Sequence, residues 1–101
     1  MSFAEVVVDG GVRRQVLADH ADLMMVAFRF GADMEGALHS HPHVQSTFVR
    51  SGVFEFSLGE ETRVVRAGDS FVIPSGMEHG CRCLEDGELI DCFTPRRDDF
   101  L

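Results

Sequence analysis

The chain has 101 residues, 45% of them apolar and nine of them Phe, which suffices for one hydrophobic core and leaves little room for a second. Nine Lys and Arg against seventeen Asp and Glu give a net charge of −8, which repels nucleic acid phosphates and anionic lipid headgroups. We therefore expect a single domain over residues 1–101 that binds neither nucleic acid nor membrane.

No apolar stretch approaches the roughly 20 residues that span a bilayer, and the first residues lack the basic and apolar regions of a secretory signal. These features predict a soluble, cytoplasmic protein. Cys81 and Cys83 are separated by one residue, a spacing on a strand that is poorly suited to a disulfide. We expect reduced thiols packed in the core.

Short turn signals rich in Gly, Asp and Ser divide the chain, at 9–11, 31–33, 51–52, 59–60, 67–69, 75–76 and 86–87. Residues 20–30 contain good helix formers, but the density of turns around them favours a strand. Large apolar residues alternate along 53–58, as on a half-buried strand. Further strands are predicted at 62–65, at 70–73 before Pro74, and at 89–93 before Pro95. The pattern predicts an all-β antiparallel sandwich or barrel, and the charged tail, which ends apolar, is expected to pack back on it.

His39, His41 and Gln45 share one parity, so on a strand they face the same side, with the two His about 6.5 to 7 Å apart at Cα. A neutral imidazole offers a metal one lone pair, and the Gln carbonyl adds a neutral oxygen. Pro42 is expected to bend the chain and bring Gln45 to a third position. A lone His-x-His also fits a surface pair or two hydrogen-bonded histidines. The Pro-Ser-Gly turn before His79 favours metal binding, because it can direct a fourth ligand into the barrel.

Two further histidines are left outside this set. His43 shares the parity of the ligands, so it is an alternative ligand or a residue that orients them. His20 is expected to be solvated. Cys81 and Cys83 share the parity of His79, but their spacing does not suit a thiolate site, and we assign them to the core.

Written as spacings, the two segments read H-x-H-x3-Q-x6-G from residue 39 to 52 and G-x5-P-x-G-x2-H from residue 68 to 79. Together they resemble the two cupin motifs, which implies a single-domain cupin, that is, a jelly-roll or double-stranded β-helix barrel. The chain departs from the motifs with Gln45 in place of Glu, Asp33 in place of Gly and Cys83 in place of Asn. Since three His and an amide carry no negative charge, we expect the ion to act as a Lewis acid rather than in manganese redox chemistry.

Longer segments, at 14–17, 38–43, 45–49, 51–56, 67–70, 79–81 and 89–100, resemble the KdgF-type pectin-degradation cupins. This resemblance implies an enzyme of carbohydrate metabolism that opens the ring of 4,5-unsaturated monouronates from pectin or alginate. The products are linear keto-aldehyde acids, formed in an isomerase- or lyase-type reaction. It also implies one divalent metal ion, a small sugar-acid substrate and a homodimer.

The resemblance also suggests roles for three residues near the C-terminus. Asp91 lies in an apolar strand, where burial raises its pKa and a metal lowers it, and it is our candidate for proton transfer. Phe93, on the same face, is expected to pack against the sugar, and Arg97 to bind a carboxylate and contribute to catalysis. Without the resemblance, they would be interpreted as a loop cap, a core aromatic and an ion-pair partner of neighbouring Asp residues.

Two other function classes remain open from the residues alone. Three His can hold Fe(II) in a small cupin dioxygenase, and a cupin can also be a non-enzymatic binder or sensor of a small molecule. Zn, Ni, Mn and Fe all accept His and Gln ligands, so the metal is open too. The preferred uronate is likewise undetermined.

Overall fold

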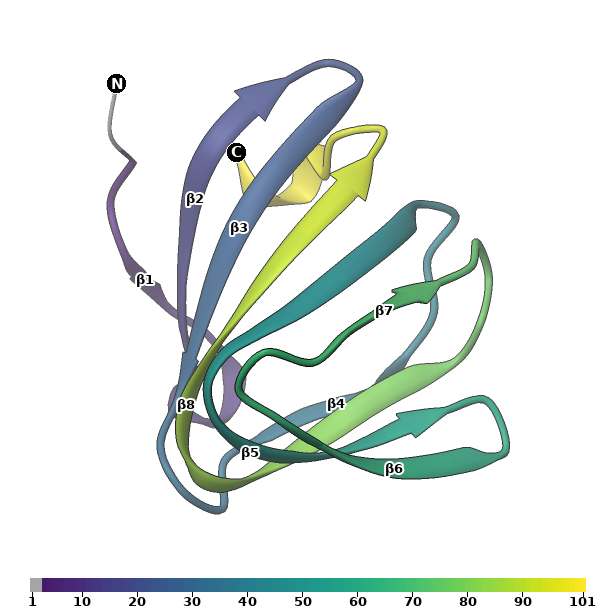
Figure 1. The fold of residues 1–101 in the computed structure, drawn as a ribbon. Helices are drawn as coiled ribbons and strands as arrows, with labels where there is room; N and C mark the ends of the chain where they lie inside the picture. The colour runs from purple at the N-terminus through teal and green to yellow at the C-terminus, as the bar shows by residue number, and fades with distance from the viewer. Residues whose placement is uncertain (1–2) are drawn as a thin grey trace.

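The computed structural model describes residues 3–101, and antiparallel strands make up most of the molecule (Figure 1). Residues 20–30 form no helix and are mostly extended, as predicted, but the chain also reverses within them, because β2 ends at His20 and β3 begins at Leu23. The strands are β1 Val6–Val7, β2 Arg13–His20, β3 Leu23–Phe30, β4 Glu35–His39, β5 Val44–Leu58, β6 Glu61–Arg66, β7 Ser70–Ile73 and β8 His79–Thr94, with 3₁₀ turns η1 Asp9–Gly11 and η2 Asp98–Phe100.

Two long strands, β5 and β8, organise the barrel. The strand order is β1-β2-β3-β8-β5-β6, with β4 paired to the first part of β8 and β7 paired to the first part of β5. Both long strands bend and thereby contribute to two facing layers (Figure 1). One layer contains β2, β3 and β7, and the other contains β4 and β6. This arrangement confirms the predicted all-β jelly-roll barrel.

The predicted turns at 51–52 and 86–87 are wrong as chain reversals, because they lie inside β5 and β8. The register between the two strands shifts around Ser51, as in a β-bulge. Gly52 has a φ of 83°, and a Cβ there would lie 2.6 Å from the carbonyl oxygens of Glu85 and Asp86. Glycine is therefore required for the close approach at which both strands bend from one layer to the other.

The core has two parts. The larger contains Val12, Phe30, Val49, Phe54, Phe56, Leu58, Val65, Ile73, Cys83 and Leu89, and the smaller contains Val16, Met24, Val26 and Phe93. Phe54, Phe56 and Leu58 confirm the alternation predicted along 53–58. Phe100 packs against the smaller part, as expected of the tail.

The cysteines are free, and Cys81 and Cys83 pack in or against the larger core, as predicted. Burial raises the pKa of the Cys81 thiol to about 12, which keeps it neutral. Within residues 3–101, no helix is long and apolar enough to cross a membrane.

Candidate metal centre

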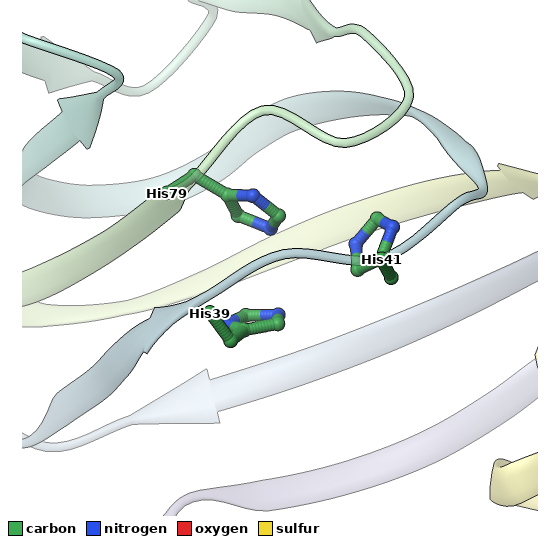
Figure 2. Close-up of side chains that lie close together, drawn as sticks. All are labelled: His39, His41 and His79. Atoms are coloured by element: carbon green, nitrogen blue, oxygen red, sulfur yellow. The ribbon is translucent and has the colours of Figure 1, made fainter.

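Three histidines, His39, His41 and His79, lie close together, as Figure 2 shows. His39 is the last residue of β4, His79 is the first of β8, and the two are direct partners in the sheet register. His41 lies in the loop before β5, rather than on a strand with His39. One ring nitrogen from each His lies within 4.8 Å of the others. The cluster is therefore compatible with one metal ion, in agreement with the spacing argument.

Each of the three rings is oriented by the backbone. Its Nδ1 atom contacts a carbonyl oxygen two residues away, at 2.8 Å for His39, 3.1 Å for His41 and 2.9 Å for His79. In a neutral imidazole, an Nδ1–H that donates to a carbonyl leaves the Nε2 lone pair free for a metal. The three histidines thus offer equivalent donors.

Gln45, the first inward-facing residue of β5, lies beside these three donors. Its Nε2 atom donates to Thr47 Oγ1 at 3.0 Å, and its Oε1 atom lies 3.0 Å from Nε2 of His41. With Nδ1 of His41 protonated, this contact brings two acceptors together, and a cation beside both satisfies them. The residues present therefore fit a divalent ion.

Protonation also suits metal binding. Burial lowers the pKa of His41, and it lowers that of His79 to about 4. Both rings are neutral near pH 7, as metal ligation requires. His39 is exposed, so the cluster is open to solvent on one side.

Asp91 points into the barrel from β8, as predicted. It is 6% exposed, and Thr47 Oγ1 donates a hydrogen bond to its Oδ1 at 2.7 Å. Burial raises the pKa of this carboxyl group to about 7. Thr47, which sequence reasoning did not single out, thus connects Asp91 to Gln45. Thr47 shares the strand parity of Gln45, and this parity is the sequence feature that places both side chains on the same face of β5.

An inner cavity of about 200 Å³ adjoins the histidines, with room for one small molecule. Its wall combines the candidate site with aromatic and aliphatic side chains, among them Phe28, Phe56 and Leu89. The predicted site residues in its lining are His39, Gln45, His79, Asp91, Phe93 and Arg97. His41 adjoins the cavity through its contact with Gln45. The structure thus brings together all seven residues.

Arg97 forms an ion pair with a neighbouring Asp, the alternative considered from the sequence, and also contacts Phe93. Its Nε and Nη2 atoms donate to the two carboxylate oxygens of Asp99, at 3.0 and 2.8 Å. Its Cζ atom also lies 5.1 Å from the ring centroid of Phe93. One edge of the guanidinium is therefore occupied while the group contacts the cavity wall.

The two remaining histidines differ. His43 is outside the three-histidine cluster, but its carbonyl oxygen contacts Nδ1 of His41, and its own Nδ1 is buried without a hydrogen-bond partner among residues 3–101. His20 is exposed at the end of β2, where its ring accepts the backbone N–H of Asp22, in line with the expected solvated position.

Comparison with known proteins agrees with this geometry. The cupin domain model matches residues 24–91. The pectin degradation protein KdgF of Dickeya dadantii is 38% identical over 90% of this chain and 84% of its own length. The structure of KdgF from Halomonas sp. superposes with a TM-score of 0.92 at 40% identity, over 97% of this chain and 91% of that one. An RmlC-like cupin from Shewanella frigidimarina gives a TM-score of 0.94 at 37% identity, over 98% and 89%. The chain therefore belongs to the cupin family and, within it, to the KdgF-type pectin-degradation proteins.

Proposed function

We propose that this protein catalyses the metal-dependent ring-opening of 4,5-unsaturated monouronates from pectin or alginate to linear keto-aldehyde acids. The observation that carries the proposal is the hydrogen-bonded chain from Gln45 through Thr47 to Asp91. It links the histidine cluster to a buried carboxyl group in a cavity of small-molecule size. The likeness to proteins named for pectin degradation supports the substrate class.

In this proposal His39, His41, Gln45 and His79 hold one divalent ion, with Zn, Ni, Mn and Fe as the candidates. When bound, the ion supplies positive charge that stabilises negative charge developing on a substrate oxygen. The donor set contains no carboxylate, so its ligands leave that charge uncompensated.

The reaction is a transfer of protons without net oxidation. The hydroxyl group at C1 loses its proton, and the bond from C1 to the ring oxygen breaks with its electrons moving to that oxygen. The resulting enolate at C5 gains a proton at C4 and becomes a ketone, which balances the proton lost from the C1 hydroxyl group. We assign this proton transfer to Asp91, because a carboxyl group with a pKa of about 7 can both accept and donate near neutral pH.

Two further residues are assigned to substrate binding. Phe93 is 1% exposed at the cavity wall, where its apolar surface suits packing against a sugar ring. Arg97 retains Nη1 beyond the two atoms bonded to Asp99. We propose that this free edge contacts the substrate carboxylate and helps to hold the reacting ring in place during catalysis.

We further propose that residues 1–101 form one domain and that two copies associate. Phe3 and Phe100, outside the range matched by the cupin model, pack against the smaller core, which supports a single domain. Uncharged side chains cover the outer face of β7 and of the adjoining parts of β3, β5 and β8, beyond the ion pairs of Glu88 with Arg29 and Arg50. The most exposed of these uncharged side chains are Leu23, Met25, Val44, Phe48 and Val72. On a chain of net charge −8, this face lets a second copy approach without charge repulsion. Sedimentation should give the mass of two 11.2-kDa chains, and a monomer would contradict the dimer.

The conjugated double bond of unsaturated uronates provides the assay for the reaction. Metal-replete protein should accelerate the loss of their ultraviolet absorbance under anaerobic conditions. A requirement for oxygen would instead indicate an iron dioxygenase. Binding without turnover of substrates derived from galacturonate, mannuronate and guluronate would indicate a non-enzymatic binder and contradict the proposal.

A further inference from the structure

Arg14 differs from most other arginines of the chain because it has no ion-pair partner among residues 3–101. Seven of the nine Arg side chains form ion pairs with Asp or Glu. The other two are Arg66, which is exposed on β6, and Arg14, which is half-buried on β2. A half-buried guanidinium without a carboxylate partner carries an unneutralised charge and free donors.

The position of Arg14 places this charge at the entrance to the candidate site. Arg14 is the direct sheet partner of Phe28. Both line an outer cavity of about 980 Å³, which also reaches His39. The outer and inner cavities share four lining residues, namely Phe28, Phe30, Gly36 and His39. The two cavities therefore adjoin at the metal centre.

Phe100, in the C-terminal turn, contacts both Arg14 and Arg97. The Cζ atoms of both arginines lie 4.2 Å from the ring centroid of Phe100, which itself packs edge-on against Phe93 at 5.7 Å. Asp99 neutralises Arg97 through two hydrogen bonds. Arg14 is thus the member of the pair with its charge uncompensated, and an anion beside it would be stabilised.

The rest of the outer cavity disfavours an anion, because Asp9, Asp33 and Glu35 also line it. A negatively charged ligand is therefore drawn toward the side of Arg14 and away from these carboxylates.

We propose that Arg14, in addition to the contact assigned to Arg97, binds the carboxylate of the sugar acid and so selects uronates over neutral sugars. Two parallel N–H groups of a guanidinium match the two oxygens of a carboxylate. The ammonium group of Lys lacks this planar, two-pronged geometry and binds a carboxylate with less directionality. The inference rests on the proposed function and adds to it a specificity-determining residue outside the two cupin motifs.

The test is calorimetric binding to the metal-loaded protein, with D-galacturonate as a saturated, unreactive acid and D-galactose as its neutral counterpart. Arg14→Gln should weaken galacturonate binding about ten- to hundredfold, as expected for a lost charged hydrogen bond, and leave galactose binding unchanged. Arg14→Lys should be intermediate. Arg66→Gln, at the other unpaired arginine, is the matched control and should bind as wild type.

Unchanged galacturonate affinity in Arg14→Gln would overturn the inference, as would equal weakening for acid and neutral sugar, which indicates a structural role. Turnover of the unsaturated substrate is measured separately, so that a failure of the proposed reaction can be distinguished from a failure of this inference. Wild-type protein that binds galacturonate through Arg14 but lacks turnover would overturn the reaction and support the binding role. Normal turnover in Arg14→Gln with an unchanged KM would overturn the role of Arg14 alone.

Discussion

Replacing Asp91 with Asn tests whether the barrel holds a neutral carboxyl group. In the folded, metal-free protein the pKa of Asp91 is about 7, against an ordinary value of 3.8. Between these values the folded state keeps a proton that the unfolded state has lost. The stability that Asp91 contributes is therefore present below about pH 4 and declines as the pH rises to 7.

The size of the effect follows from the shift. About three pKa units at 1.36 kcal/mol each give about 4 kcal/mol in total, of which about 2 to 3 kcal/mol falls between pH 5 and pH 8. The lowered pKa values of His41 and His79 act in the opposite direction, because their contribution to stability is lost as the pH falls. Both histidines are present in wild type and variant, so their contribution cancels in the difference.

The measurement is urea unfolding of both proteins in the presence of a chelator at several values between pH 5 and pH 8. The free energy of unfolding of Asp91→Asn should rise by about 2 to 3 kcal/mol relative to wild type across this range. A difference that stays constant with pH would refute a buried, protonated Asp91. Restoring the metal should reduce the slope, because a nearby cation favours the carboxylate.

Other predictions concern the metal and the bend. Asp91→Asn should keep its metal content and lose turnover, whereas His79→Ala should lose both. Metal analysis measures the first property and the ultraviolet assay the second. Normal turnover in Asp91→Asn would show that Asp91 is not the general acid and base. Gly52→Ala should lower the free energy of unfolding by several kcal/mol because its Cβ meets two carbonyl oxygens at 2.6 Å. Gly59→Ala, with a φ of 60° and no atom within 4 Å, should cost only about 1 kcal/mol, and equal losses in the two variants would contradict the steric argument.

The sequence was sufficient for part of the strands and for the seven predicted site residues that the structure brings together. Alternation along 53–58 depends on local periodicity, and Pro74 and Pro95 mark strand ends directly. The histidine spacing was equally informative, although His41 lies in a loop and not on the strand that the parity argument assumed.

The bend at Ser51 and Gly52 could not be distinguished from a turn by sequence. A glycine with positive φ is compatible with both a turn and a bulge. At Gly52 the long pairing between β5 and β8 makes it a bulge within the strand. The contact of Arg14 with Phe100 also could not be predicted from the sequence, because it joins the second strand to the last turn of the chain. Local patterns carry no information on such distant pairs.

Gln45 has two functions that a Glu at this position could not combine. Its oxygen faces His41, while its N–H group donates to Thr47 and so directs the Thr47 hydroxyl proton to Asp91. A carboxylate at residue 45 would lack that donor and would compete with Asp91 for the same hydroxyl group.

We therefore expect Gln45→Glu to retain its metal against a higher chelator concentration, since the new charge attracts the cation, and to lose at least about tenfold in kcat. The added negative charge would offset the charge of the ion and raise the pKa of Asp91. Chelator titration and the ultraviolet assay measure the two effects separately. Tighter metal retention with undiminished kcat would show that neither the neutral donor set nor the Thr47 contact matters for turnover. Unchanged metal retention would instead place residue 45 outside the ligand set.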